Sequence, residues 1–179
     1  LSPIVYFSGL VFQCCSSMSA AQKTLAFFFP EQARQGYIPH PTAGRLWLLR
    51  LGYFKLHTPL EQADDWAWLT DHAVEIGKHR FLGIIGIRLA DLPPPGECLK
   101  LSDMRTVALL PVEASTQEIV HQQLETVASE TGIIPKAILS DEGSDLSGGI
   151  DRFRMAHPET TRHRDMPHMC ARLLKKRLE

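Results

Sequence analysis

The fold is decided by the stretch Ala137-Ile138-Leu139-Ser140-Asp141-Glu142-Gly143-Ser144-Asp145-Leu146. Residues 137–139 are apolar, and Pro135 and Ser140 bracket them. A run this short favours a buried strand over a helix. Asp141 follows at the carboxyl end of that strand, which is where open α/β sheets bind their ligands.

A helix is expected after this strand, with acidic residues in the turn between them. Ser144 can cap the helix. Its apolar positions recur at helical spacing as Leu146, Ile150 and Phe153. A carboxylate held by a rigid turn at a strand end is suited to hold a divalent cation. Asp141 and Asp145 also favour turns for purely local reasons, so this stretch alone leaves both interpretations open.

Composition indicates a cytosolic globular chain. The 179 residues are 44% hydrophobic, which is enough to bury a core. The four cysteines lack metal-knuckle spacing, so reduced thiols are expected; they are Cys14, Cys15, Cys98 and Cys170. No apolar run is long enough to span a membrane, and the apolar residues 1–12 lack the basic start of a signal peptide. Because the chain does not begin with Met, we expect a fragment or part of a longer reading frame.

The net charge of -1 hides an uneven distribution. Residues 1–60 carry five Lys and Arg against one Glu, and residues 61–150 carry six against fifteen acidic residues. Residues 151–179 carry eight Lys and Arg against four acidic residues. An acidic middle between basic ends suits a metal centre flanked by surfaces that accept polyanions. Ordinary variation among solvated faces is the alternative.

The first 58 residues are predicted to be helical. One helix is expected over residues 16–29, stopped by Pro30, and a second over residues 43–51, opened by Thr42 and ended by Gly52. The second helix is predicted to have two different faces. The inward face is Leu46, Trp47 and Leu51, and the other is Thr42, Arg45 and Leu49.

Two helices joined by a turn, the second short and carrying arginine, resemble a helix-turn-helix. Arg45 and Arg50 are then the main candidates for contact with DNA bases or phosphates, together with Thr42. The alternative is a plain helical hairpin that packs on the main domain. We therefore expect a domain boundary at residue 58, with a second domain over residues 59–179.

The second domain is predicted to alternate strands and helices. Strands are expected at 66–74, 81–88, 107–112, 137–139 and 160–164. Helices are expected from a capping box of Ser115 and Glu118 to Gly132, from Ser144, and over residues 167–178. Strands joined by short turns, such as Gly77-Lys78, pair antiparallel, whereas strands joined through helices pair parallel. The result is an α/β fold with a mixed five-stranded sheet, which places Asp71 beside Asp141 if their strands are neighbours.

In this strand order, Trp68-Leu69-Thr70-Asp71-His72 and the stretch 138–146 resemble the ribonuclease H-like catalytic core of DDE transposases. Asp165-Met166-Pro167-His168, with the apolar residues after it, resembles the segment that follows the second aspartate in bacterial insertion-sequence transposases. Mutator-like enzymes carry Cys-x-x-His there. Residues 16–51 look like the helix-turn-helix that precedes the core, so the resemblance covers roughly residues 16 to 179.

The resemblance implies that Asp71 and Asp141 are the first two acidic residues of the DDE set. In the family these residues hold two divalent ions, usually magnesium, with manganese as the alternative. The ions activate a water or 3′-hydroxyl and stabilise the leaving oxygen at a phosphodiester. The resemblance also implies double-stranded DNA as partner (element ends and target), a homo-oligomer on DNA, no membrane association, and a bacterial cytoplasmic, nucleoid-associated location.

The third acidic residue of the family, usually a Glu on a later helix, has no good match. Glu179 would lie too far along the last helix, whereas Asp165 is better placed, at a strand end. We expect the catalytic Glu beyond residue 179, so that this chain is a truncated transposase and inactive alone. The alternatives are a DNA-binding remnant without catalysis and a ribonuclease H-like nuclease or an unrelated metal-dependent hydrolase.

Overall fold

The computed structural model describes the whole chain except residues 1, 77–78, 95, 113, 142 and 166–179. The described chain divides into two compact units, Leu1–His57 and Thr58–Glu179. The helix predicted over residues 167–178, the turn at Gly77-Lys78 and Glu179 lie outside the described residues. None of the helices in the described ranges has the length and hydrophobicity needed to cross a bilayer.

The first unit contains only helices. These are α1 (Pro3–Phe12), α2 (Met18–Phe28), α3 (Pro30–Arg34) and α4 (Pro41–Leu56). The Ser17 hydroxyl caps α2 by accepting from the N–H of Ala20 at 3.1 Å. Phe7, Ala21 and Leu25 are buried together and form a small core. The first of the two predicted helices is therefore present, and it ends before Pro30, which begins a further short helix.

The second predicted helix is longer and faces differently than expected. It continues through Gly52 to Leu56, because a helix interior tolerates a glycine at a cost of only about 1 kcal/mol. Leu46 is 48% exposed and Leu51 is 42% exposed, so the prediction that they face inward is wrong. Of the three residues, Trp47 does pack against the small core, with its ring edge-on to Phe7. A unit this small has too little interior to cover a whole helix face.

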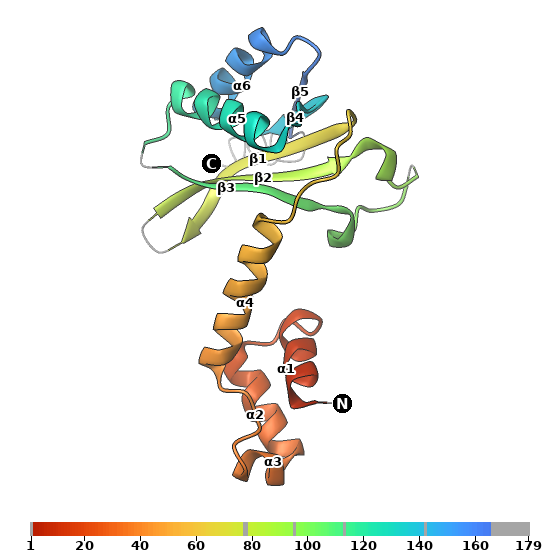
Figure 1. Ribbon diagram of the computed structural model, residues 1–179, viewed down its shortest axis with the longest axis vertical. Helices are drawn as coiled ribbons and strands as arrows, with labels where there is room; N and C mark the ends of the chain where they lie inside the picture. Colours follow the sequence, from red (N-terminus) through yellow and green to blue (C-terminus); the bar gives the residue numbers. More distant parts are fainter. Residues whose placement is uncertain (1, 77–78, 95, 113, 142, 166–179) are drawn as a thin grey trace, which may run out of the picture. The chain divides into compact units, whose positions relative to one another are not determined.

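The second unit is a mixed five-stranded sheet with two helices on one face (Figure 1). The strands are β1 (Trp66–Ile76), β2 (His79–Arg88), β3 (Arg105–Val112), β4 (Ala137–Ser140) and β5 (Thr161–Arg164), and their order is β3-β2-β1-β4-β5. The pairs β1–β2 and β2–β3 are antiparallel, whereas β1–β4 and β4–β5 are parallel. The predicted fold class, α/β with a mixed five-stranded sheet flanked by helices, is therefore confirmed.

The helices α5 (Gln117–Thr131) and α6 (Ser144–Ala156) pack on each other and cover the face of the sheet that carries the main core. The core joins the two tryptophans of β1 to apolar residues of both helices; among its members are Trp66, Trp68, Val120, Leu124, Ile138, Ile150 and Phe153. Gly132, at a φ of 69°, ends α5 in the left-handed conformation, as predicted.

Both predicted helix caps in this unit are wrong. Thr116, not Ser115, caps α5 by accepting from the N–H of Ile119 at 3.3 Å. Ser144 is the first residue of α6 and not its cap, because the cap position belongs to Gly143. Two short 3-10 helices, Leu89–Asp91 and Leu101–Asp103, lie in the segment between β2 and β3.

Candidate metal centre at the acidic edge

Three aspartates lie where the parallel pairing of three neighbouring strands ends, at one edge of the sheet. Thr70 pairs with Ser140, and Ser140 pairs with Arg164, across the parallel strands β1, β4 and β5. Each of these three residues is followed directly by an aspartate, and the three aspartates are Asp71, Asp141 and Asp165. We call the three aspartates the acidic edge. Parallel strands bring their carboxyl ends to the same side, so all three positions predicted as metal ligands lie at this edge.

Buried hydroxyls beneath the acidic edge fix the strand ends. Thr70 and Ser140 are each 3% exposed. The Thr70 hydroxyl donates to the carbonyl of Leu139 at 3.3 Å, and the Ser140 hydroxyl donates to the carbonyl of Asp141 at 3.0 Å. The N–H of Asp165 donates to the carbonyl of Ser140 at 3.0 Å, which continues the β4–β5 pairing past its last register pair. The backbone that carries the aspartates is therefore well anchored.

The pairing of β1 becomes irregular at the acidic edge itself. Asp71 is opposite Gly83 of β2, but the next pair is Val74 with Phe81, so one extra residue of β1 is accommodated after Asp71. A bulge of this kind locally re-aims the side chains of the bulged strand. Asp71 is exposed and His72 is half-buried, so the bulge lies where one side chain faces solvent and the next turns toward the helices.

The turn after β4 brings two carboxylates together. Asp141 accepts from the N–H of Gly143 through Oδ1 at 3.0 Å. A Cβ on Gly143 would lie 3.1 Å from the same Asp141 oxygen and 2.8 Å from Oδ1 of Asp145. Both carboxylate oxygens thus border the small space that glycine leaves open. A larger residue would fill this space and push them apart.

Three residues from distant parts of the chain meet beside this turn. The Ser115 hydroxyl donates to Oδ2 of Asp145, and its oxygen lies 3.1 Å from Nδ1 of His72. His72 Nδ1 is also 3.2 Å from the same Asp145 oxygen. We call Ser115, His72 and Asp145 the Asp145 clasp. It ties together β1, the segment that leads into α5, and the first turn of α6.

The clasp keeps Asp145 charged. Burial by itself raises the pKa of the Asp145 carboxyl. Hydrogen bonds from Ser115 and from the backbone N–H groups of Leu146 and Asp145, together with the charge of His72, outweigh burial and hold this pKa below its ordinary value. Asp145 is therefore a carboxylate at neutral pH, close to a second carboxylate on Asp141.

Sequence reasoning treated the clasp residues separately. The sequence predicts Ser115 in a capping box and, for Asp145, leaves open a local role in the turn or a role in binding a cation. The adjacent Ser115 and Thr116 are both good capping residues, so the pattern did not decide between them. Their positions along the chain gave no signal that residues 72, 115 and 145 meet.

The residues of the acidic edge have the right chemistry for magnesium. This ion prefers hard oxygen ligands and keeps several waters, so one or two carboxylates are enough to hold it. Glycine at position 143 leaves a cradle that a Cβ would fill, bordered by Oδ1 of Asp141 and Oδ1 of Asp145. Within the described residues, no cluster of three or more His, Cys, Asp or Glu side chains has metal-binding geometry. The fit to magnesium therefore rests on the oxygen donors of the aspartates.

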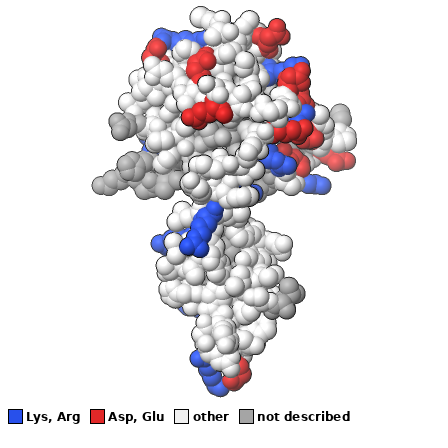
Figure 2. Space-filling model, viewed as in Figure 1, with Lys and Arg blue, Asp and Glu red and all other residues white. Residues whose placement is uncertain are grey.

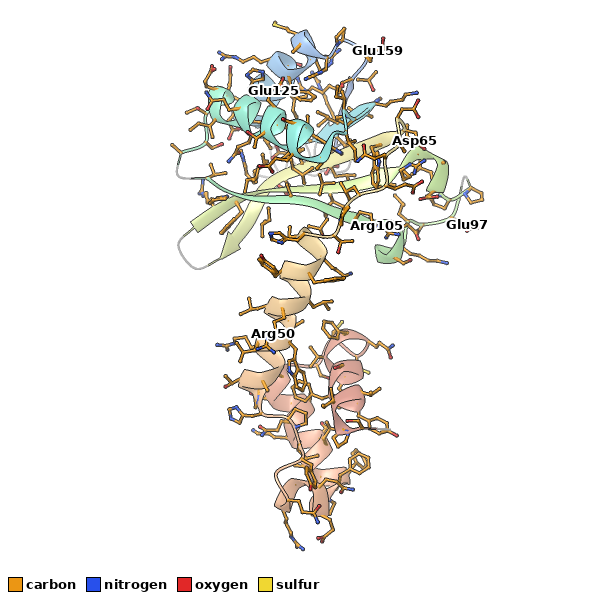
Figure 3. The ribbon with its side chains drawn as sticks, in the orientation of Figure 1. Arg50, Asp65, Glu97, Arg105, Glu125 and Glu159 are labelled. Atoms are coloured by element: carbon orange, nitrogen blue, oxygen red, sulfur yellow. The ribbon has the colours of Figure 1, made fainter. Side chains whose placement is uncertain are left out.

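The residues predicted to bind DNA belong to the first unit. Thr42, Arg45 and Arg50 are all exposed on α4. The Thr42 hydroxyl lies 3.0 Å from Nδ1 of His40, at the start of the helix. Arg50 projects sideways from α4 (Figure 3). In the view of Figure 2 the surface of this unit is mostly uncharged, with few basic side chains standing out.

No family model and no curated protein matches the chain. Among solved structures, it is similar to the HTLV-2 integrase catalytic core domain in complex with magnesium. The trimeric form matches at 13% identity with a TM-score of 0.38, over 66% of this chain and 72% of that chain. The dimeric form matches at 15% identity with a TM-score of 0.36, over 68% and 75%. A likeness at this level says nothing about activity.

Proposed function

We propose that this chain carries the core of a DDE-type transposase of an insertion sequence, which cleaves and joins DNA strands with divalent metal ions. The observation that supports the proposal is the shared register of Thr70, Ser140 and Arg164, which puts the three aspartates of the acidic edge at one level. Magnesium or manganese, when bound, would activate the attacking oxygen and stabilise the leaving one. Asp71 and Asp141 hold the ions in this proposal, with Asp165 as a further ligand.

The proposed substrate is double-stranded DNA. Thr42, Arg45 and Arg50 support this part, since they are exposed together on α4 in a unit with five basic residues and one acidic residue. Such side chains contact phosphates or base edges in many DNA-binding helices. Assembly of several copies on DNA belongs to the same proposal.

Metal binding is the first test, because it does not require a complete set of catalytic acids. Binding of Mn²⁺ to the full 179-residue chain is followed by electron paramagnetic resonance. We expect Asp71→Asn and Asp141→Asn each to weaken binding by at least about tenfold, whereas Asp91→Asn, in an exposed 3-10 helix, leaves it unchanged. Equal affinities in all four proteins would overturn the proposal.

Substrate choice is the second test. The chain is incubated with plasmid DNA, labelled duplex DNA and an RNA–DNA hybrid, each with Mg²⁺ or Mn²⁺. Nicking of duplex DNA that Asp71→Ala abolishes supports the transposase and shows that residues 1–179 suffice for cleavage. Preferential cleavage of the hybrid favours a ribonuclease H-like nuclease. DNA binding without any metal binding favours a non-catalytic remnant.

A further inference from the structure

The two carboxylate oxygens of Asp145 have different surroundings. Oδ2 is engaged by the Ser115 hydroxyl and lies 3.2 Å from Nδ1 of His72. Oδ1 borders the space beside Gly143, as Oδ1 of Asp141 does. The side chain of Asp145 is 27% exposed and that of His72 is 16% exposed, whereas Ser115 is exposed. One oxygen of Asp145 is thus fixed within the protein, and the other is directed at the acidic edge.

The positions of the protons decide which groups of the Asp145 clasp donate and which accept. A serine hydroxyl has one proton, and the Ser115 proton goes to Asp145. The 3.1 Å contact between Ser115 and His72 therefore needs a proton on Nδ1 of His72. His72 and Ser115 both donate toward Asp145, so the carboxylate cannot turn away without leaving two donors unpaired. Leaving the mostly buried donor of His72 without a partner is unfavourable, and this holds the carboxylate in place.

Oδ1 of Asp145 borders the same space as Oδ1 of Asp141, so the two negative charges need a group that reduces their repulsion. Two carboxylate oxygens, from Asp141 and Asp145, border a space that a single methyl group would fill. Like charges at this separation repel, and a hydrogen-bond donor or a cation between them relieves the repulsion. Asp141 already receives the N–H of Gly143, and a carboxylate oxygen with two lone pairs can accept a further hydrogen bond from a water.

We propose that Asp145 is a positioning residue of the acidic edge: held by Ser115 and His72, it accepts a hydrogen bond from a water of the hydrated cation at Asp141. This inference rests on the proposed function. Magnesium keeps most of its waters in proteins, so residues that accept from those waters orient the ion without touching it. The role needs a carboxylate with one oxygen held by the protein and the other near Asp141, which is what the Asp145 clasp provides.

The test measures Mn²⁺ bound to the full chain, by electron paramagnetic resonance for affinity and by water proton relaxation for the ordered waters. We expect Asp145→Asn to weaken binding about tenfold, and to change the relaxation enhancement per bound ion. Ser115→Ala should change the Mn²⁺ affinity and the relaxation enhancement in the same direction as Asp145→Asn does. The changes should be smaller, because this substitution frees the Asp145 carboxylate without removing it. Ser115→Thr keeps the hydroxyl and should restore both readouts.

The matched controls are Asp103→Asn and Ser102→Ala. Ser102 also donates to an aspartate, Asp103, at 3.0 Å, but this pair lies in the 3-10 helix before β3. Both controls should leave Mn²⁺ binding unchanged. Circular dichroism checks that each variant folds, and if Asp145→Asn does not, the comparison of Ser115→Ala with Ser115→Thr decides.

The outcomes separate this inference from the proposed function. If Asp71→Asn and Asp141→Asn weaken binding while Asp145→Asn and Ser115→Ala behave as the unchanged chain, the inference is overturned and the proposed function stands. If none of these substitutions weakens binding, the metal centre itself is absent and both fail. A loss in Ser115→Ala that Ser115→Thr does not restore also overturns the inference, because it would reflect packing and not the hydroxyl.

Discussion

Thr70 and Ser140 are register partners on adjacent parallel strands, and both are buried directly beneath the acidic edge. Their hydroxyls donate to the backbone carbonyls of Leu139 and Asp141, so both hydroxyls hold the end of β4. Small buried hydroxyls at this level leave the strands close enough to pair while satisfying polar groups that a purely apolar pair would not. Because Thr70 and Ser140 are register partners, the residues that follow them, Asp71 and Asp141, lie at the same level of the sheet.

Replacing Thr70 by Val should remove the buried hydrogen bond to Leu139 while keeping the shape of the side chain. We expect the free energy of unfolding to fall by about 1 kcal/mol, as for other single hydrogen bonds. Urea denaturation measures the change. Thr106→Val, at an exposed position of β3, is the control and should stay within about 0.5 kcal/mol. Equal stabilities of the two variants would show that the Thr70 bond contributes nothing.

Gly143 tests the space between the carboxylates. An alanine Cβ there would lie 2.8 Å and 3.1 Å from oxygens of Asp145 and Asp141, so the side chains must move apart. The φ of Gly143 is −55°, so the backbone accepts alanine without strain. We expect Gly143→Ala to weaken Mn²⁺ binding roughly tenfold with little change in thermal stability. Binding as tight as in the unchanged chain would mean that this space does not matter for the metal.

Gly149 tests the contact between the two helices. Its Cβ would lie 2.5 Å from Val120 and 2.9 Å from the backbone oxygen of Gln117, neither of which can yield easily. We expect Gly149→Ala to lower the free energy of unfolding by about 1 to 3 kcal/mol, as overpacking does. In contrast, Gly52→Ala meets open space inside α4 and should raise stability by up to about 1 kcal/mol. Urea denaturation of both variants gives the comparison, and a neutral Gly149→Ala would contradict the tight packing of α5 on α6.

Asp65 predicts how the stability of the folded chain depends on pH. The Arg88 side chain, which donates to Asp65 through Nε, lowers the pKa of the Asp65 carboxyl; the N–H of Ala90 adds to this effect against the opposing effect of burial. Asp65 lies where the chain enters β1 (Figure 3). Because the folded pKa is below the unfolded value, the stabilisation is present above about pH 4 and is lost as the pH falls through the folded pKa.

Asp65→Asn should therefore unfold at lower temperature than the unchanged chain at pH 7, and the gap should narrow below about pH 4. Calorimetry between pH 3 and pH 7 measures both curves. Asp64→Asn, next in the chain, is the control and should follow the unchanged chain closely. A gap that widens on acidification would reverse the sign and contradict the role of Arg88.

DNA binding by α4 predicts a salt effect. Arg45→Ala and Arg50→Ala should each weaken binding to duplex DNA and lower the slope of log affinity against log salt by about one. Lys23→Ala removes the same charge from an exposed position of α2 and should have a smaller effect. Fluorescence anisotropy at several salt concentrations measures all three. Equal effects from the three variants would indicate a general attraction between charges, without a defined DNA-contacting face on α4.

The order of strands and helices along the second unit could be predicted because each segment carried its own signal. The apolar run before Asp141 and the aromatic alternation of β1 are local features, and connection length indicated whether strands pair parallel or antiparallel. That Asp71 lies beside Asp141 was predicted only on the condition that their strands are neighbours, and the pairing of β1 with β4 meets this condition. This part of the site was accessible from sequence because it depends on backbone pairing.

The contacts of side chains could not be predicted in the same way. Ser115 and Thr116 are equivalent as capping residues, and only the meeting of Ser115 with His72 and Asp145 separates them. Gly52 carries a signal for the end of a helix, but α4 passes through it to Leu56. In each case a local preference of about 1 kcal/mol yielded to the three-dimensional surroundings.

The position of β1 at the centre of the sheet has a consequence for how the chain folds. Its antiparallel partner β2 follows almost at once, but its parallel partner β4 emerges only after β3 and α5 have been synthesised. Pairings between distant segments form slowly, because their loop-closure entropy must be overcome first. During synthesis the three-stranded meander can therefore assemble early, with one edge of β1 open to wrong partners. Asp71 and Asp141 come to the same level only when β4 pairs with that edge of β1.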